Sequence, residues 1–191
     1  MKRLSFITLL FLACLALAGC AVTSSQETYK RTDMNFGMLR SVAVLPFQNL
    51  TSEEEAAARV RDTFSGMLLA TEALEVLPPG EMQRGLNRVN PENRHSPTLE
   101  EIKELGSVLK VDAVITGTLR EYETLRSGAS EAHVISLSLQ MLEVETGTII
   151  WSASSTRGGI TMMDRLFGGG GEAKNPITRQ ACNELLDRLF D

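Results

Sequence analysis

Cys20 is the residue of this chain whose chemistry the sequence defines best. It follows residues 17–19 (Leu-Ala-Gly) at the end of an N-terminal leader. The leader opens with basic residues 2 and 3 and continues with the apolar stretch 4–18, the order typical of a secretory signal peptide. That stretch is shorter than the roughly 20 residues that a membrane-spanning helix needs. The sequence therefore predicts that residues 1–19 are a signal peptide, with a thiol directly after the cleavage point.

Residues 17–20 resemble the lipobox of bacterial lipoproteins. The resemblance implies that a diacylglycerol is attached to the Cys20 thiol, that residues 1–19 are removed, and that the new amino terminus receives an N-acyl chain. Several acyl chains, at about 0.8 kcal/mol per methylene, would hold the protein on a membrane essentially permanently. Ala21, by the same resemblance, implies the outer membrane, with the chain facing the periplasm.

Two other fates of the leader stay open. Residues 16–18 (Ala-Leu-Ala) also fit an ordinary signal peptidase site, which would release a soluble secreted protein that begins at Gly19. The leader could also be retained as an anchor. The three fates differ in whether Cys20 carries lipid.

Composition limits the kinds of partner. The chain has 191 residues and a net charge of −5, and loss of the two basic residues of the leader makes the mature charge −7. An acidic chain without a long basic run is a poor ligand for nucleic acid or for anionic lipid, so the membrane is expected as a partner only through the acyl chains. Cys14 lies in the leader and Cys20 is expected to be acylated. Cys182 then has no disulfide partner and is expected to be buried and inert.

The residue types that could support catalysis or bind a metal do not cluster. His95 and His133 have no carboxylate or cysteine at ligand spacing beside them. The glycines at 168–171 lack the preceding strand and the following Lys-Ser/Thr pair of a phosphate loop. We therefore expect no catalytic residue, no metal and no cofactor beyond the acyl chains at Cys20, and a protein that is not an enzyme.

One apolar cluster lies in the glycine-rich stretch 157–174. Its members are Ile160, Met162, Met163, Leu166 and Phe167. Beside flexible glycines, such a cluster could dock a partner or a neighbouring subunit, or it could be a short helix packed on its own domain. The pattern leaves both alternatives open.

The remaining patterns define the elements that would position these residues. Residues 20–38 are predicted to be the lipidated N-terminus and a flexible polar tether that spans at most about 60 Å. Residues 39–191 are predicted to form one α/β domain whose mixed sheet has about five strands, in the order β-α-β-α-α-β-β-β-α, backed by helices. The expected strands are 41–47, 74–77, 111–119, 133–141 and 149–153; the expected helices are 52–70, 81–89, 98–109 and 176–189, with capping boxes at Ser52–Glu55 and Thr98–Glu101.

Three segments carry a family resemblance. Residues 42–47 with the helix behind them, residues 111–119 and residues 143–151 resemble the lipoprotein superfamily of the curli secretion channel subunit CsgG, the penicillin-binding-protein activator LpoB and the amino-terminal domain of TolB. The resemblance spans about residues 40–156. It implies a periplasmic domain with a helix-backed mixed sheet, whose relatives are adaptors or channel subunits and not enzymes, with no catalytic residue to carry over.

Together these patterns predict the class of function. We expect an outer-membrane-anchored periplasmic lipoprotein that acts as a binding or assembly adaptor for an envelope machine of secretion, efflux or cell-wall synthesis. The alternative is a subunit of an oligomeric CsgG-like export channel, which keeps a homo-oligomer open. The channel members insert amphipathic hairpins, whereas here residues 121–131 are charged with little alternation and residues 157–174 are short and glycine-rich. The sequence does not identify the envelope protein partner.

Overall fold

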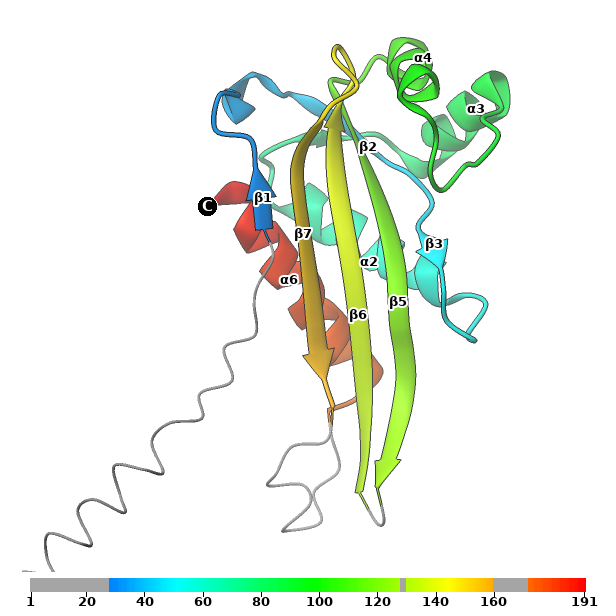
Figure 1. The fold of residues 1–191 in the computed structure, drawn as a ribbon, viewed down its shortest axis with the longest axis vertical. Coiled ribbons are helices and arrows are strands. Elements are labelled where there is room, and N and C mark those ends of the chain that lie inside the picture. Colours follow the sequence, from blue (N-terminus) through cyan, green and yellow to red (C-terminus); the bar gives the residue numbers. More distant parts are fainter. Residues whose placement is uncertain (1–27, 128–129, 160–171) are drawn as a thin grey trace, which may run out of the picture.

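The computed structural model describes residues 28–127, 130–159 and 172–191. Seven strands form one mixed sheet in the order β1-β7-β6-β5-β2-β4, with β3 paired beside β5 (Figure 1). Strands β5, β6 and β7 form an antiparallel meander, while β2 runs parallel to β4 and β5. The bounds are β1 Thr28–Lys30, β2 Ser41–Val44, β3 Gln48–Asn49, β4 Glu75–Val76, β5 Ala113–Ser127, β6 Ser130–Glu143 and β7 Ile149–Gly158. The predicted α/β class with a mixed sheet is confirmed.

In the described part of the chain, four helices pack on the two faces of the sheet. They are α2 Ala56–Ala70, α3 Pro79–Val89, α4 Leu99–Leu109 and α6 Lys174–Phe190, and a 3₁₀ turn, η1, covers Phe36–Met38. Helices α2 and α6 lie behind the meander, whereas α3 and α4 sit at one end of the molecule (Figure 1). Among the described residues, no helix is long and apolar enough to cross a membrane.

Alternating side chains divide the core into two layers. Val42 and Val44 of β2 belong to the cluster under α2 and α6, while Ala43 and Leu45 belong to the cluster under α3 and α4. This follows from the two-residue period of a strand that is buried on both faces. Trp151 is fully buried in the first cluster, and its indole Nε1 donates a hydrogen bond to the Arg188 carbonyl oxygen at 3.1 Å.

Cys182 lies in the same layer, as expected from its place on the apolar stripe of α6. Its side chain is fully buried, and burial raises the pKa of the thiol to about 12. A thiol with so high a pKa is almost entirely protonated and unreactive near neutral pH. Cys182 therefore acts as a small core residue.

Helix starts follow the predictions in one case and not in another. At α4, Thr98 accepts a hydrogen bond from the Glu101 backbone N–H and Glu101 accepts one from the Thr98 backbone N–H, so the predicted capping box is present. At α2 the predicted box is wrong: the helix begins at Ala56 and its N-cap position makes no side-chain hydrogen bond. The preceding residues instead form a turn, because the Asn49 side-chain amide donates to the Glu53 carbonyl oxygen at 2.8 Å.

The structure also differs from the prediction at the N-terminal segment. Residues 28–30 pair with β7, with Thr28 opposite Ala153 and Lys30 opposite Trp151. The pairing satisfies backbone groups along what would otherwise be the free edge of β7. The part of the predicted tether from residue 28 to residue 38 therefore lies on the domain.

Strand β5 extends past its predicted end at residue 119. A bulge between Leu119 and Glu121 shifts the register, after which β5 pairs with β6 as far as the hairpin end. Beyond the bulge, Tyr122 is buried while Glu121 and Glu123 are exposed. The alternation was obscured in the sequence because both sets of side chains carry polar groups.

Candidate docking surfaces

The site residues predicted from the sequence lie outside the described residues. They are Cys20 and the cluster Ile160, Met162, Met163, Leu166 and Phe167. The structure does place the flanks of that cluster. The Gly159 backbone N–H donates to the His133 carbonyl oxygen at 2.9 Å, and α6 begins at Lys174. Both flanks lie at the end of the molecule opposite α3 and α4 (Figure 1).

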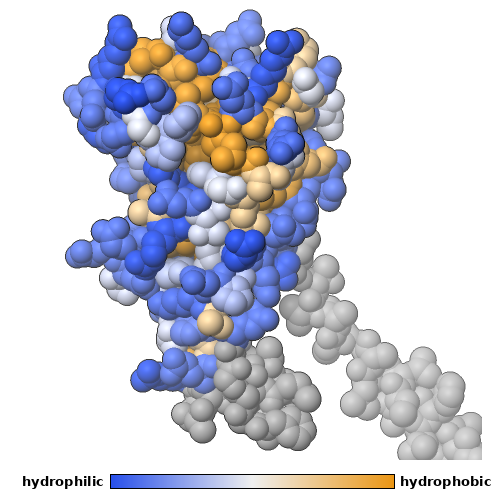
Figure 2. Space-filling model, turned by 180° about the vertical axis from the view of Figure 1, so that it is seen from behind, coloured by the Kyte–Doolittle hydropathy of each residue, from blue (hydrophilic) through white to orange (hydrophobic). Residues whose placement is uncertain are grey.

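Figure 2 shows that apolar residues gather over one half of the helix-bearing face. Several large apolar side chains are exposed in the described part of the chain, including Leu69 at 58% and Phe190 at 44%. These two residues lie near the C-terminal ends of α2 and α6. Each lines one of two hollows, which we call the edge groove and the terminal pocket.

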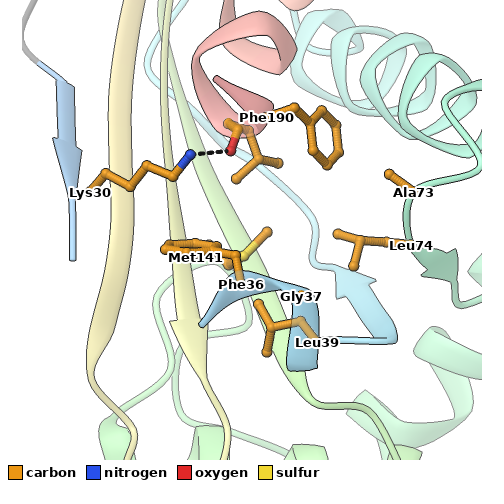
Figure 3. A pocket seen from close by; sticks show the side chains of 9 residues that line it. Lys30, Phe36, Gly37, Leu39, Ala73, Leu74, Met141 and Phe190 are labelled. Carbon is orange, nitrogen blue, oxygen red and sulfur yellow. Dashed lines mark hydrogen bonds between the residues drawn. The ribbon is translucent and has the colours of Figure 1, made fainter. Parts of the chain in front are cut away.

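The terminal pocket has a volume of about 270 Å³ and is mostly apolar (Figure 3). Its lining residues are Lys30, Phe36, Gly37, Leu39, Ala73, Leu74, Met141, Leu189 and Phe190. The pocket is thus built from β1, η1, the loop between α2 and β4, strand β6 and the end of α6, which are distant in sequence. The Lys30 ammonium donates to the Leu189 carbonyl oxygen at 3.0 Å and lies 5.1 Å from the Phe36 ring centroid, so its charge is held at the pocket wall.

The edge groove is larger, at about 540 Å³, and lies between α2 and the chain that follows the edge strand β4. Its lining residues are Val44, Arg61, Asp62, Ser65, Gly66, Leu69, Val76, Leu77, Pro78 and Pro79. A methyl group added at Gly66 would meet no atom within 4 Å, so this wall of the groove is open. Arg61 and Asp62 form an ion pair at 2.7 Å and supply the charged groups of the groove.

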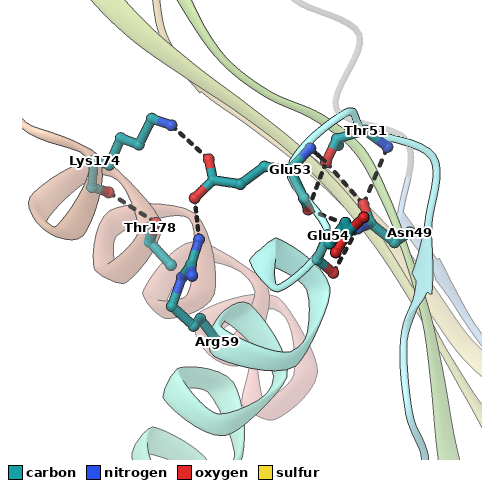
Figure 4. A network of polar contacts seen from close by, with 7 residues as sticks. All are labelled: Asn49, Thr51, Glu53, Glu54, Arg59, Lys174 and Thr178. Carbon is teal, nitrogen blue, oxygen red and sulfur yellow. Dashed lines mark hydrogen bonds and ion pairs between the residues drawn. The ribbon is translucent and has the colours of Figure 1, made fainter.

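A polar network joins the beginnings of α2 and α6 (Figure 4). The Lys174 ammonium contacts the Glu53 carboxylate at 2.6 Å and lies 4.8 Å from the Tyr122 ring centroid, and Arg59 pairs with the same carboxylate. The hydrogen bond from Lys174, with the nearby positive charges, lowers the pKa of Glu53. The contacts are internal and fasten the start of α6, which follows the segment 160–171.

Other charged and titratable groups of the described residues also serve the fold. The Glu184 carboxylate accepts hydrogen bonds from Ser155, Arg157 and Arg188; burial raises its pKa, but these partners outweigh that effect and the pKa is lowered overall. His133 Nδ1 lies 2.7 Å from the Thr124 hydroxyl. His95 Nδ1 lies 3.3 Å from a backbone carbonyl oxygen. Within the described part of the chain, no three metal-ligating side chains come together.

Comparisons with known proteins identify the fold. Residues 21–156 match the family model described as peptidoglycan-synthase activator LpoB. No curated protein sequence matches the chain. The PelC dodecamer from Paraburkholderia phytofirmans is 14% identical with a TM-score of 0.57, covering 86% of this chain and 96% of that one. The lipoprotein GNA1162 from Neisseria meningitidis is 14% identical with a TM-score of 0.58, covering 79% and 98%. At such identities, the likeness to solved structures shows the fold alone.

Proposed function

Because this chain belongs to the LpoB family of peptidoglycan-synthase activators, which are not enzymes, we propose that it is a periplasmic adaptor that binds and activates a peptidoglycan synthase. In this proposal acyl chains at Cys20 hold it on the outer membrane. The single observation that carries the proposal is the family match over residues 21–156, which includes helices α2 to α4 and all of the meander except the last two residues of β7. Our proposal thus selects cell-wall synthesis among the envelope machines that the sequence left open.

The terminal pocket is the surface that we assign to the synthase. Its lining is apolar, and its single charged group, Lys30, is already bonded to the Leu189 carbonyl oxygen. An apolar side chain of a partner could therefore enter without displacing water from an unpaired charge. Phe190 stands at the rim with 44% of its surface exposed, and an aromatic side chain of this kind is typical of a binding hot spot.

The position of β1 limits how far from the membrane this contact can occur. The proposed anchor, Cys20, precedes Thr28 by only eight residues, which reach at most about 28 Å even when fully extended. That is about half of the reach expected for a tether that continues to residue 38. Lys30 of the terminal pocket lies two residues after the end of this connection. The proposal therefore requires a synthase surface close to the outer membrane.

The test is a glycan-polymerisation assay with the purified lipoprotein in detergent and a peptidoglycan synthase from the same cells. We expect the polymerisation rate to rise with lipoprotein concentration until it saturates, and the two proteins to co-purify. A rate that stays constant while the domain is folded would contradict the function.

The anchor is tested separately with Cys20→Ser. We expect the variant to lose lipid label and membrane fractionation in cells, and to keep its effect on the synthase in solution, because the substitution changes none of the residues that line the terminal pocket. Membrane association without incorporated lipid would contradict the proposed attachment.

A further inference from the structure

A third hollow, which we call the acidic hollow, adjoins the terminal pocket. It has a volume of about 530 Å³, and Leu39 lines both cavities. Phe36 and Gly37 of η1 line the terminal pocket (Figure 3), while Met38 of the same turn lines the acidic hollow. Because Phe36 and Met38 are two residues apart, their α-carbons lie within about 7 Å of each other. A single segment of a partner can therefore contact both cavities.

We infer that the acidic hollow binds a lysine or arginine side chain of the synthase, a few residues from the apolar side chain that enters the terminal pocket. The inference rests on the proposed function, because it takes the synthase as the partner of the terminal pocket. It adds the chemistry of the segment that the synthase must present.

Every charged side chain that lines the acidic hollow is negative. These side chains are Asp33, Asp112, Glu143 and Glu145. Asp33 pairs with Arg31 at 2.8 Å, whereas the other three form no ion pair with any residue that the structure describes. The lining is therefore more negative than its neighbours neutralise, and it attracts a cationic group.

Two of these carboxylates are held by neutral donors. The Asp112 carboxylate accepts hydrogen bonds from the backbone N–H groups of Arg40 at 2.8 Å and Ser41 at 2.9 Å. The bond from Arg40, with those from Ser41 and the nearby Arg40 charge, outweighs burial and lowers the pKa of the Asp112 carboxyl. Glu143 accepts a hydrogen bond from the Thr146 hydroxyl at 2.6 Å. A hydroxyl or backbone donor orients a carboxylate and leaves its negative charge in place.

The rest of the lining is largely apolar, and this favours a long basic side chain. Met38, Leu39, Val111 and Val144 contribute apolar walls, and Met38 has 74% of its surface exposed. Lysine and arginine carry a charged head on an apolar stem, so the stem can cover these walls while the head reaches a carboxylate. A bare metal ion fits less well, because no three metal-ligating side chains come together in the part of the chain that the structure describes.

The charges also determine the direction of the bound segment. The terminal pocket has a positive group at its wall, the Lys30 ammonium. A basic side chain in that pocket would meet a like charge, whereas in the acidic hollow it meets opposite charges. The two cavities therefore select the orientation with the apolar side chain in the terminal pocket and the basic one in the acidic hollow.

Charge substitutions at Glu145 test the contact. Glu145 is exposed in the turn after β6, and its side chain makes no hydrogen bond with another described residue, so the fold should tolerate a change there. The measurement is the Kd of the mature lipoprotein for the immobilised periplasmic part of the synthase. We expect Glu145→Gln to raise the Kd by about threefold and Glu145→Lys by about tenfold or more, with both effects shrinking at high salt.

Glu123→Lys is the matched control, because it makes the same change of charge at another exposed glutamate. Glu123 pairs with Val134 of β6, which lies nine residues from Glu143 along the strand and thus about 30 Å from the hollow. At this distance salt screens the charge, so we expect the Kd to change by less than about twofold.

The outcomes separate this inference from the proposed function. If the wild type binds the synthase but Glu145→Lys matches Glu123→Lys, the inference is overturned and the function stands. Equal effects of Glu145→Gln and Glu145→Lys, or effects that do not change with salt, would also overturn it, because the contact would not depend on charge. A wild-type protein that does not bind the synthase would contradict the proposed function itself, and the inference with it.

Discussion

Phe190→Ala tests the terminal pocket as the synthase-binding surface. An aromatic side chain that becomes fully buried removes about 150–250 Å² from water. Phe190 is 44% exposed in the free domain, so docking could bury a further area of about 65–110 Å² of this ring. At about 25 cal/mol per square ångström, the loss of that contact costs about 2 kcal/mol. We therefore expect the Kd for the synthase to rise about 30-fold.

The assay is a titration of the immobilised periplasmic part of the synthase with the mature lipoprotein. Phe190 is the last residue of α6 and is absent from the buried core, so the variant should keep the far-UV circular dichroism of the wild type. Leu125→Ala is the control, because Leu125 is 38% exposed and lies on β5, outside the pocket. Phe190→Ala with a Kd within about twofold of the wild type, or an equal effect of Leu125→Ala, would refute the assignment.

Three further predictions concern the domain itself. Gly106→Ala should destabilise the protein by about 1–3 kcal/mol in urea unfolding, because the added methyl would lie 2.1 Å from Val144 Cγ1; Gly80→Ala, which meets no atom within 4 Å, should not. Cys182 should react with a thiol reagent at pH 8 at least about a thousandfold more slowly than in denaturant, since burial raises its pKa from 9.0 to about 12; rapid labelling of the native protein would contradict this. Lys174→Met should destabilise the protein at pH 7, and this effect should disappear below about pH 4. The pKa of Glu53 is lowered in the folded protein, so the Glu53–Lys174 ion pair stabilises the fold above the unfolded-state pKa and loses its effect once the carboxyl is protonated. A difference in stability that stays constant with pH would contradict the role of the pair.

Local patterns were enough to predict most of the sheet and all four described helices. The alternation of Ile135, Leu137, Leu139 and Met141 predicts β6 because one face of that strand is buried under α2 and α6. The turn after β6 also follows from its residues, since Gly147 has a φ of +71°, which favours glycine. Such elements can be predicted because each is specified by its own residues: the apolar face that a strand or helix must bury, or the glycine that a turn needs.

Elements that depend on a distant partner could not be predicted. Strands β1 and β3 have three and two residues, too few to show a period, and each exists because a longer strand offers it an edge. The predicted capping box at Ser52–Glu55 is wrong for a related reason. The Asn49 side-chain amide donates to the carbonyl oxygens of residues 53 and 54, and these contacts hold the segment before α2 in a turn.

The terminal pocket and the edge groove also depend on residues that are distant in sequence, so neither could be predicted. Lys30, Met141 and Phe190 meet in the terminal pocket although more than a hundred residues separate the first from the others. The sequence did carry a weak signal, because Leu69 and Phe190 interrupt the polar sides of two helices whose apolar stripes were recognised. Whether such a residue lines a pocket depends on what the fold places beside it.

The edge position of β1 determines how the domain responds to mechanical load. Tension on the chain ahead of Thr28 acts first on three residues of β1, which are held by their pairing with β7 and by the Lys30–Leu189 hydrogen bond. Strand β2 is instead enclosed between β4 and β5. If β1 detaches, residues 28–30 add about 10 Å of chain. Met34 and Phe36, which pack against the core cluster, still hold the following segment on the domain. Under tension we therefore expect β1 to detach from β7 and to lengthen the connection to Cys20 before the domain unfolds.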